Sequence, residues 1–253
     1  AETRLTQAST DTGSFFGADT ETFTLDKVGN RTAHSKVSGI WTYDKNNRIT
    51  QRGSGACGSS GVTCYDWDAA GNLIKKTEAA KITQYAYDAQ NRLTEVKEGA
   101  SNLIARYGYD PLNRRIWKEQ YRDRTGAALI QAKRTYYLYA DEGSIAESEQ
   151  DITLNADNSV TATGAPSIST QYGLKPGAPF MTGVLFVKTK NSNGTPSFAY
   201  YHHDHLQTPI QATDKLGNIV WSANYEAFGK ATITTPKATA TRPTISSKLR
   251  FPG

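Results

Sequence analysis

The densest group of chemically capable side chains is the run His202, His203, Asp204 and His205. On a β-strand His203 and His205 would lie on one face, a geometry that metal sites use, but the sequence offers no third ligand. His202 and Asp204 would share the other face and could pair as acid and base, yet no nucleophile motif accompanies them. We therefore expect packing or hydrogen-bonding roles, with His203 and His205 as weak metal candidates, no cofactor and no enzyme activity.

A second candidate is the basic run between Arg114 and Arg124, which is interleaved with Trp117 and Tyr121. On a strand most of its basic side chains would face away from the two aromatic rings, so charge and stacking would not meet on one surface. The formal net charge of the chain is only +5, with both signs interspersed. We expect a solvated strand face and no nucleic-acid partner.

The two cysteines, Cys57 and Cys64, enclose the loop GSSGVT. In an oxidising compartment they could close a local disulfide, which would fit a secreted protein, and two reduced thiols remain the alternative. No further ligand pair lies at the spacing of a zinc finger. The sequence has no apolar run of about 18 residues and no signal segment, so we expect no membrane span. It begins at Ala1, with its only Met at position 181, which suggests a processed chain or an excerpt.

The elements that carry these residues belong to a repeat. An aromatic residue, a spacer, a second aromatic, Asp, two further residues and then Asn or Gly recur along the chain. The pattern occurs five times, with Leu25 in place of the second aromatic in the first repeat, and the Asp residues lie 18, 24, 20 and 22 positions apart. Such a period is typical of repeat architectures. The Asp anchors are Asp26, Asp44, Asp68, Asp88 and Asp110, and a later segment adds Asp214 with Gly217.

Each repeat predicts one β-hairpin. The aromatics three and one residues before Asp lie on one strand face, so stacked repeats would form an aromatic ladder of Phe23, Trp41, Tyr43, Tyr65, Trp67, Tyr85, Tyr87, Tyr107 and Tyr109. The Asp carboxylate would accept backbone amides in a tight turn. The third residue after Asp would take positive φ, as Gly and Asn do most readily, at Gly29, Asn47, Gly71, Asn91 and Asn113.

Composition agrees with this reading, because 14 Tyr, 4 Trp, 8 Phe and 21 Gly favour many short strands and turns. We predict an all-β protein, a curved strip of stacked antiparallel hairpins in one continuous structural domain. Within it, residues 1–125 form the repeat hairpins and residues 126–199 longer, degenerate hairpins of the same sheet. Residues 200–253 form a distinct final section with a Thr/Pro-rich tail.

The repeats, together with YHHDHLQTP and the following DKLGNIVWSANYEAFG, resemble the Rhs and YD-repeat family, whose core region opens with similar motifs. The resemblance implies an arc of a β-shell that often encloses a C-terminal toxin in secreted bacterial polymorphic toxins. Related shells occur in toxin complexes and in teneurins. The chain departs from the family pattern in two respects: it lacks the DPxGxxGG-like motif, and Gln207 stands where the family usually has Gly.

We therefore expect a non-enzymatic structural segment of such a shell, secreted or at a bacterial cell surface, that encapsulates or scaffolds a toxin or surface protein. Its partners would be the rest of the shell or another subunit, bound through exposed sheet edges, and an enclosed toxin. The alternative is an adhesion module that binds carbohydrate through exposed aromatic residues.

Overall fold

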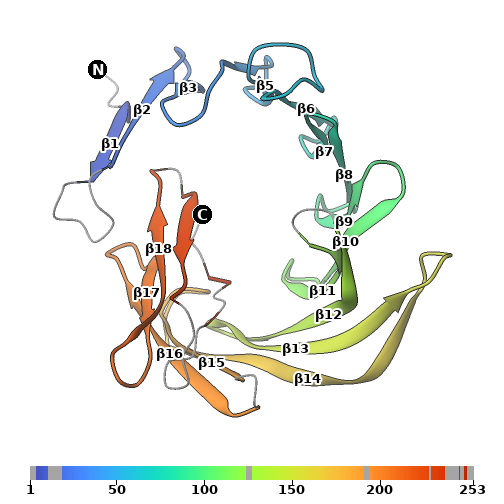
Figure 1. Ribbon diagram of the computed structural model, residues 1–253, viewed down its shortest axis with the longest axis vertical. Helices are drawn as coiled ribbons and strands as arrows, with labels where there is room; N and C mark the ends of the chain where they lie inside the picture. Colours follow the sequence, from blue (N-terminus) through green and yellow to red (C-terminus); the bar gives the residue numbers. More distant parts are fainter. Residues whose placement is uncertain are drawn as a thin grey trace. The chain divides into compact units, whose positions relative to one another are not determined.

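The structure of the chain is a computed structural model, and it describes residues 4–10, 19–123, 127–190, 194–227, 229–236, 245 and 248–249. The regular elements in these ranges are all β-strands, numbered β1 to β19 (Figure 1). Within the same ranges no helix is long and apolar enough to cross a membrane. The prediction of an all-β protein is confirmed.

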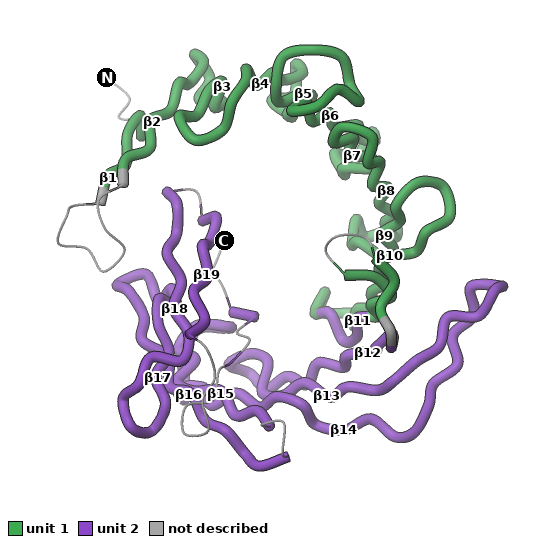
Figure 2. Tube along the Cα trace, viewed as in Figure 1, with its two compact units in different colours: residues 1–114, 119–130 green, residues 115–118, 131–253 purple. Residues whose placement is uncertain are grey.

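The chain divides into two compact units (Figure 2). Unit 1 comprises residues 1–114 and 119–130, and unit 2 comprises residues 115–118 and 131–253. Hydrogen bonding follows chain order throughout: β1 to β3 form a three-stranded sheet, and β4 to β19 form a sheet of 16 strands in sequence order. This meander confirms the predicted stack of antiparallel hairpins. The predicted divisions at residues 125 and 199 stay predictions.

Unit 1 is a strip of short hairpins that curves along its length in Figure 2. Its strands are β1 (Gln7–Thr10), β2 (Asp19–Leu25), β3 (Arg31–His34), β4 (Trp41–Tyr43), β5 (Ile49–Arg52), β6 (Thr63–Trp67), β7 (Leu73–Glu78), β8 (Lys81–Tyr87), β9 (Leu93–Glu98) and β10 (Asn102–Tyr109). The strand β11 (Arg115–Arg122) is shared by the two units. Every second turn of unit 1 contains one of the five Asp anchors, so these turns all lie at the same end of the strands.

Unit 2 has longer strands. They are β12 (Ala128–Ala140), β13 (Gly143–Leu154), β14 (Val160–Leu174), β15 (Val184–Lys190), β16 (Pro196–His203), β17 (Pro209–Thr213), β18 (Ile219–Tyr225) and β19 (Ala231–Thr234). The apolar run from Met181 to Lys190 predicts a buried strand over its whole length, but β15 begins only at Val184. Met181 instead has a φ of 61° and donates its backbone N–H to the Glu142 carbonyl at 2.8 Å.

The main apolar core lies in unit 2, on one face of its sheet. Val187 pairs with Ala199, and Tyr201 pairs with Ala212, which in turn pairs with Trp221. These side chains share one face because cross-strand partners point the same way. The buried cluster consists of Val184, Val187, Ala199, Tyr201, Ala212, Val220, Trp221, Ala223 and Ile245. In unit 1 the buried apolar residues are instead distributed along the strip, from Phe23 to Tyr121.

Candidate functional site

The repeated turn of unit 1 is built on the Asp carboxylate, as the hairpin of Asp88 illustrates. The Asp88 N–H donates to the Arg92 carbonyl, and the Asn91 N–H donates to the Asp88 carbonyl, both at 3.0 Å. The Asp88 Oδ1 accepts the N–H groups of Gln90 and Arg92, also at 3.0 Å. In all five repeats Oδ1 accepts the N–H of the fourth residue after Asp. One oxygen therefore closes each turn.

The third residue after each Asp has a left-handed backbone. Its φ is 96° at Gly29, 60° at Asn47, 90° at Gly71, 60° at Asn91 and 64° at Asn113. Gly and Asn tolerate this conformation better than other residues do, so the residue type at this position follows from the turn.

The fourth residue after Asp connects one hairpin to the next, a role that the sequence analysis missed. The amide nitrogen of Asn30 donates to Asp26 Oδ2 at 2.9 Å and to Asn47 Oδ1 at 3.0 Å. In the same way the amide nitrogen of Asn72 donates to its own Asp68 at 2.9 Å and to Asn91 of the next turn at 2.8 Å.

Arginine makes the same forward connection with a longer side chain. Arg48 donates from Nε to Asp44 Oδ2 at 2.8 Å and from Nη1 to the Asp68 carbonyl at 3.0 Å. Arg92 likewise donates from Nε to Asp88 at 2.8 Å and from Nη1 to the Asp110 carbonyl at 3.0 Å. The signal in the sequence is that this position is always Asn or Arg in the five repeats, and both residues can donate two hydrogen bonds at once.

The aromatic residue directly before Asp makes the backward connection. It donates its polar hydrogen to the carbonyl of the fifth residue after the preceding Asp. The distances are 2.7 Å from Tyr43 to Arg31, 2.7 Å from Trp67 to Ile49, 3.0 Å from Tyr87 to Leu73 and 2.8 Å from Tyr109 to Leu93. These rings are therefore hydrogen-bond donors as well as packing groups. We call the forward and backward bonds together the turn ladder.

The aromatic residue three positions before Asp has a more varied environment. Phe23 is buried and stacks on His34, with ring centroids 5.0 Å apart. The guanidinium of Arg31 lies 4.1 Å from the ring centroid of Trp41, a cation–π contact. The rings of Tyr65, Tyr85 and Tyr107 are half-buried.

The hydrogen bonds of the turn stabilise the charged form of each Asp. The backbone N–H of Arg92, joined by its guanidinium, holds the pKa of Asp88 below its usual value. For Asp68 the side-chain amide of Asn72, followed by its backbone N–H, has the same effect on the pKa. Because these carboxylates are ionised acceptors with occupied oxygens, they are turn-forming groups rather than acid–base catalysts.

In unit 2 the same turn forms at Asp204, which the sequence analysis assigned to the histidine group. Asp204 Oδ1 accepts the N–H groups of Leu206 at 2.8 Å and Thr208 at 2.9 Å. Gln207 takes the left-handed position with a φ of 64°. The following aromatic residue, Tyr225, donates to the Pro209 carbonyl at 3.0 Å, which repeats the backward bond of unit 1. The turn therefore forms although Gln replaces the usual Gly.

Asp214 also forms this turn. Its Oδ1 accepts the N–H of Asn218 at 2.9 Å, and Gly217 has a φ of 82°. However, Asp214 joins β17 to β18, whereas Asp204 joins β16 to β17. Successive turns of a meander lie at opposite ends of the strands, so Asp214 lies at the other end of the unit 2 sheet from Asp204.

The histidines do not take the strand geometry on which a metal site would depend. The strand β16 ends at His203, and His205 lies in the exposed turn that follows. Among the described residues, neither belongs to a group of three potential His, Cys, Asp or Glu ligands. Burial lowers the pKa of His203. His202 makes a 2.9 Å hydrogen bond with the hydroxyl of Thr213.

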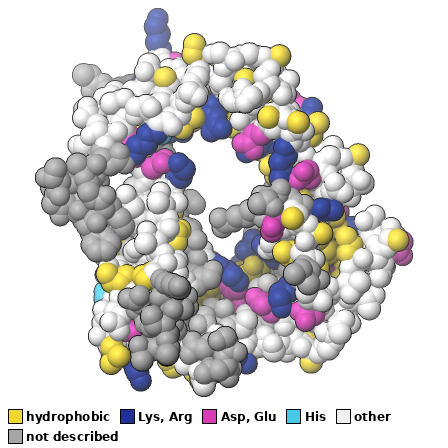
Figure 3. Space-filling view, viewed as in Figure 1, with side chains coloured by type: hydrophobic (Ala, Val, Ile, Leu, Met, Phe, Trp, Pro, Cys, Tyr) yellow, Lys and Arg dark blue, Asp and Glu magenta, His cyan; other side chains and the backbone are white. Residues whose placement is uncertain are grey.

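The basic run from Arg114 is engaged in local contacts. Arg114 pairs with Asp110 at 2.7 Å, and the buried Tyr121 donates its hydroxyl to the buried Glu119. The guanidinium of Arg134 lies 5.8 Å from the ring centroid of Trp117. Arg124 lies outside the described residues. On the face drawn in Figure 3, basic and acidic side chains are interspersed.

Cys57 and Cys64 form a disulfide with their Cα atoms 5.8 Å apart. Cys64 is buried in β6, and Cys57 lies in the exposed loop before it.

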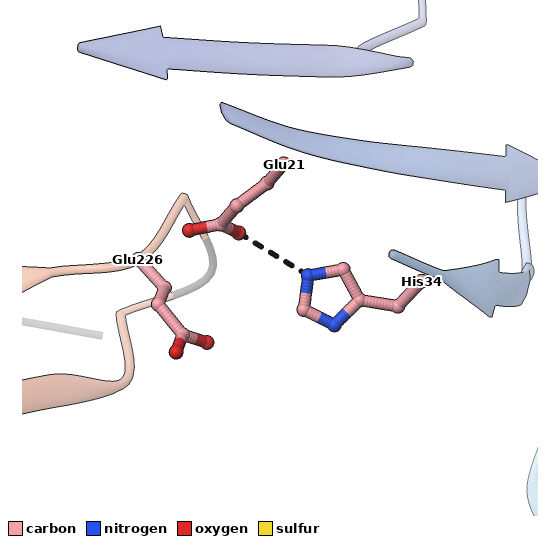
Figure 4. Close-up of side chains that lie close together, drawn as sticks. All are labelled: Glu21, His34 and Glu226. Atoms are coloured by element: carbon pink, nitrogen blue, oxygen red, sulfur yellow. Dashed lines mark hydrogen bonds and ion pairs between the residues drawn. The ribbon is translucent and has the colours of Figure 1, made fainter. Parts of the chain in front are cut away.

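Unit 1 also contains a buried polar pair that the sequence did not reveal. Glu21 of β2 and His34 of β3 face each other, with Oε2 and Nε2 3.3 Å apart (Figure 4). Lys36 approaches the other Glu21 oxygen at 3.2 Å. These contacts join the two strands of the first hairpin.

Comparison with known proteins agrees with this repeat geometry. Residues 1–158 match the family model described as teneurin YD-shell, and residues 198–234 match the model described as RHS protein. Double-stranded DNA deaminase toxin A of Burkholderia cenocepacia is 28% identical over 202 residues, which cover 75% of this chain and 13% of the toxin. Toxin protein Tse5 of Pseudomonas aeruginosa is 24% identical over 244 residues, 81% of this chain and 18% of the toxin.

Among solved structures, the Photorhabdus luminescens Tc holotoxin pore is similar with a TM-score of 0.41 and 14% identity, over 85% of this chain and 13% of that one. The chain therefore spans less than a fifth of the length of each of these relatives.

Proposed function

The chain belongs to the teneurin YD-shell family, and from this premise we propose that it is a non-enzymatic segment of an Rhs-type shell that encloses or scaffolds a toxin. The observation that carries the proposal is the turn ladder. Its amides and guanidinium groups bond forward to the next hairpin, and its tyrosine hydroxyls bond back to the preceding one. Side chains that would otherwise be candidates for binding or catalysis thus act as cross-links of a repeat strip.

The partners of such a segment would bind at its strand edges. The order of the large sheet ends at β4 and β19, and the small sheet ends at β1 and β3. Strand edges expose unpaired backbone groups that bind further strands. We propose that the rest of the shell, or another subunit, covers these edges, that an enclosed toxin is the cargo, and that the assembly is secreted or at the cell surface.

The test uses the complete reading frame that contains this chain. Purified protein is treated with a protease, and cleavage outside residues 1–253 is followed over time. We expect Asp88→Ala combined with Asp110→Ala to expose protected regions to cleavage, because two adjacent turns of the strip lose their carboxylates. Gln90→Ala combined with Leu112→Ala changes neighbouring exposed turn residues and should leave the protection intact. Equal cleavage of both variants and the wild type would contradict an enclosing role.

A second candidate function is carbohydrate binding, and the aromatic face of β15 and β16 is the observation that favours it. Phe198 and Tyr200 are 39% and 42% exposed, and the ring centroid of Phe186 lies 6.0 Å and 6.3 Å from theirs. Phe198 and Tyr200 flank Ala199, which packs in the core, so they lie on the opposite face of the sheet. Exposed rings of this kind can stack on sugars.

A glycan array distinguishes the two functions. If the module binds carbohydrate, Tyr200→Ala should abolish a signal that Ile233→Ala leaves unchanged, because Ile233 is a similarly exposed residue of unit 2 (37%) without a ring. An array without a signal would count against this second function and leave the structural role unaffected.

A further inference from the structure

The junction between β3 and β4 differs from the other junctions between successive hairpins of unit 1. β3 is the last strand of the three-stranded sheet, and β4 is the first strand of the sheet that follows. The residues from Arg31 to Tyr43 are all described, and the two strands belong to different sheets. Backbone hydrogen bonds of a strand pair therefore do not join the β2–β3 hairpin to the β4–β5 hairpin.

The later junctions do have such a ladder. Two residue pairs join β5 to β6, four join β7 to β8 and four join β9 to β10. Several backbone hydrogen bonds must break together before two strands separate, so these junctions resist opening.

Side chains alone maintain the turn ladder across the unpaired junction. The Tyr43 hydroxyl donates to the Arg31 carbonyl at 2.7 Å, and the Asn30 amide donates to Asn47 Oδ1 at 3.0 Å. The Arg31 guanidinium also lies over the Trp41 ring. Each of these contacts ends in a side chain with rotatable bonds, so each can break without disturbing a strand.

The backbone on either side of the junction is well anchored. On one side the Val37 N–H donates to the His34 carbonyl at 3.2 Å. On the other side the Gly53 N–H donates to the Ile40 carbonyl at 3.0 Å. A Cβ atom at Gly39 would lie only 2.4 Å from the Gly53 Cα, so Gly39 is packed directly against the β5–β6 loop. Bending is thereby confined to the backbone around Ser38, between Val37 and Gly39.

We propose that the β3–β4 junction is a hinge of unit 1, at which the β2–β3 hairpin rotates relative to the β4–β5 hairpin. The side-chain contacts across the junction stabilise the arrangement in which they are formed. The flexible element is the backbone at Ser38, which lies between the anchored residues Val37 and Gly39. Hinges of this kind are short segments between rigid elements that absorb a change of backbone angles.

The test compares two pairs of spin labels in the full chain by pulsed electron resonance. Val28→Cys with Asn46→Cys spans the proposed hinge, and Gln90→Cys with Leu112→Cys spans the paired β9–β10 junction. All four are exposed residues two positions after an Asp anchor, so the pairs are matched. Both native cysteines are in the disulfide, and labelling without reductant therefore targets the introduced thiols.

We expect a distance distribution across the hinge at least about twofold wider than across β9–β10, because the unpaired junction samples more orientations. Tyr43→Phe should widen the first distribution further, whereas its matched control Tyr109→Phe should leave the second unchanged. Equal widths in the wild type would overturn the hinge. An unchanged first distribution in Tyr43→Phe would overturn the role of the side-chain contacts.

Discussion

Unit 1 and unit 2 stabilise the same kind of hairpin by different means. In unit 1 the turn ladder cross-links successive hairpins in addition to the backbone pairing from β5 to β10, and its members are half-buried polar groups such as Asn72 and Tyr87. In unit 2 they enclose an apolar cluster around Trp221, which is 1% exposed. The same type of hairpin can therefore build two kinds of structure. It forms an extended strip where the turns supply cross-links, and it forms a unit with a hydrophobic core where the residues on one strand face are small and apolar.

The largest effect should come from the core of unit 2. Trp221→Ala should lower the free energy of unfolding by about 3–5 kcal/mol, because it removes a large ring and leaves a cavity. Denaturant unfolding measures this value, and hydrogen exchange assigns the loss to unit 2. Tyr200→Ala removes an exposed ring from the same sheet and should cost much less. Similar losses in both variants would mean that the cluster is not the main support of unit 2.

The next largest effect should come from a turn of unit 1. Asn91→Val should lower the free energy of unfolding by about 1–3 kcal/mol, since a β-branched residue is strained at a φ of 60°. Gln90→Val is the control at the adjacent exposed position and should cost much less. Equal losses at the two positions in denaturant unfolding would contradict the turn assignment.

A smaller, opposite effect is expected where unit 2 repeats the turn imperfectly. Gln207→Gly should raise the free energy of unfolding by about 1 kcal/mol, because Gly adopts positive φ without a steric penalty. The matched variant Gln211→Gly in β17 should lower it, since Gly weakens a strand interior. A destabilised Gln207→Gly protein would show that the Gln207 side chain is needed there.

The smallest effect per residue should be a dependence of the stability of unit 1 on pH. The pKa values of Asp44, Asp68 and Asp88 are lowered in the folded chain by the hydrogen bonds of the turn. A lowered pKa means that the stabilisation is complete above the unfolded pKa of about 3.9 and is lost as the pH falls through the folded value. Denaturant unfolding at a series of pH values from neutral to acidic measures the slope of the free energy of unfolding against pH.

Asp88→Asn should flatten this slope, because the amide does not titrate. Asp66→Asn is the control, since Asp66 lies on an exposed strand face and its carboxylate pairs with Lys75 outside the turns. An identical slope in Asp88→Asn and the wild type would contradict the contribution of the turn carboxylates.

Much of the fold could be predicted from the sequence, because hairpin periodicity and turn chemistry are local. The spacing of Tyr85, Tyr87, Asp88 and Asn91 is sufficient to place a strand and a turn with positive φ. The cross-links could not be predicted in this way, because Tyr87 reaches Leu73 and Asn72 reaches Asn91 only after neighbouring hairpins have paired in register. A local pattern shows which face a side chain occupies but not how far it extends into the next repeat.

For the histidine group the residue types predict packing or hydrogen bonding but not the particular structure. Asp204 accepts the N–H groups of Leu206 and Thr208 in the same turn that the unit 1 repeats form. Its agreement with the unit 1 repeats is visible only when the residues after Asp204 are considered along with those before it.

The central claim is that side chains of successive turns are energetically coupled, and a double-mutant cycle tests it most directly. Asn72→Ala removes the donor, and Asn91→Gly removes the acceptor while preserving positive φ. We predict a coupling free energy of about 0.5–1.5 kcal/mol from denaturant unfolding of the four proteins. A coupling of zero within error would show that the Asn72–Asn91 bond does not stabilise the pairing of successive turns and would contradict the turn ladder.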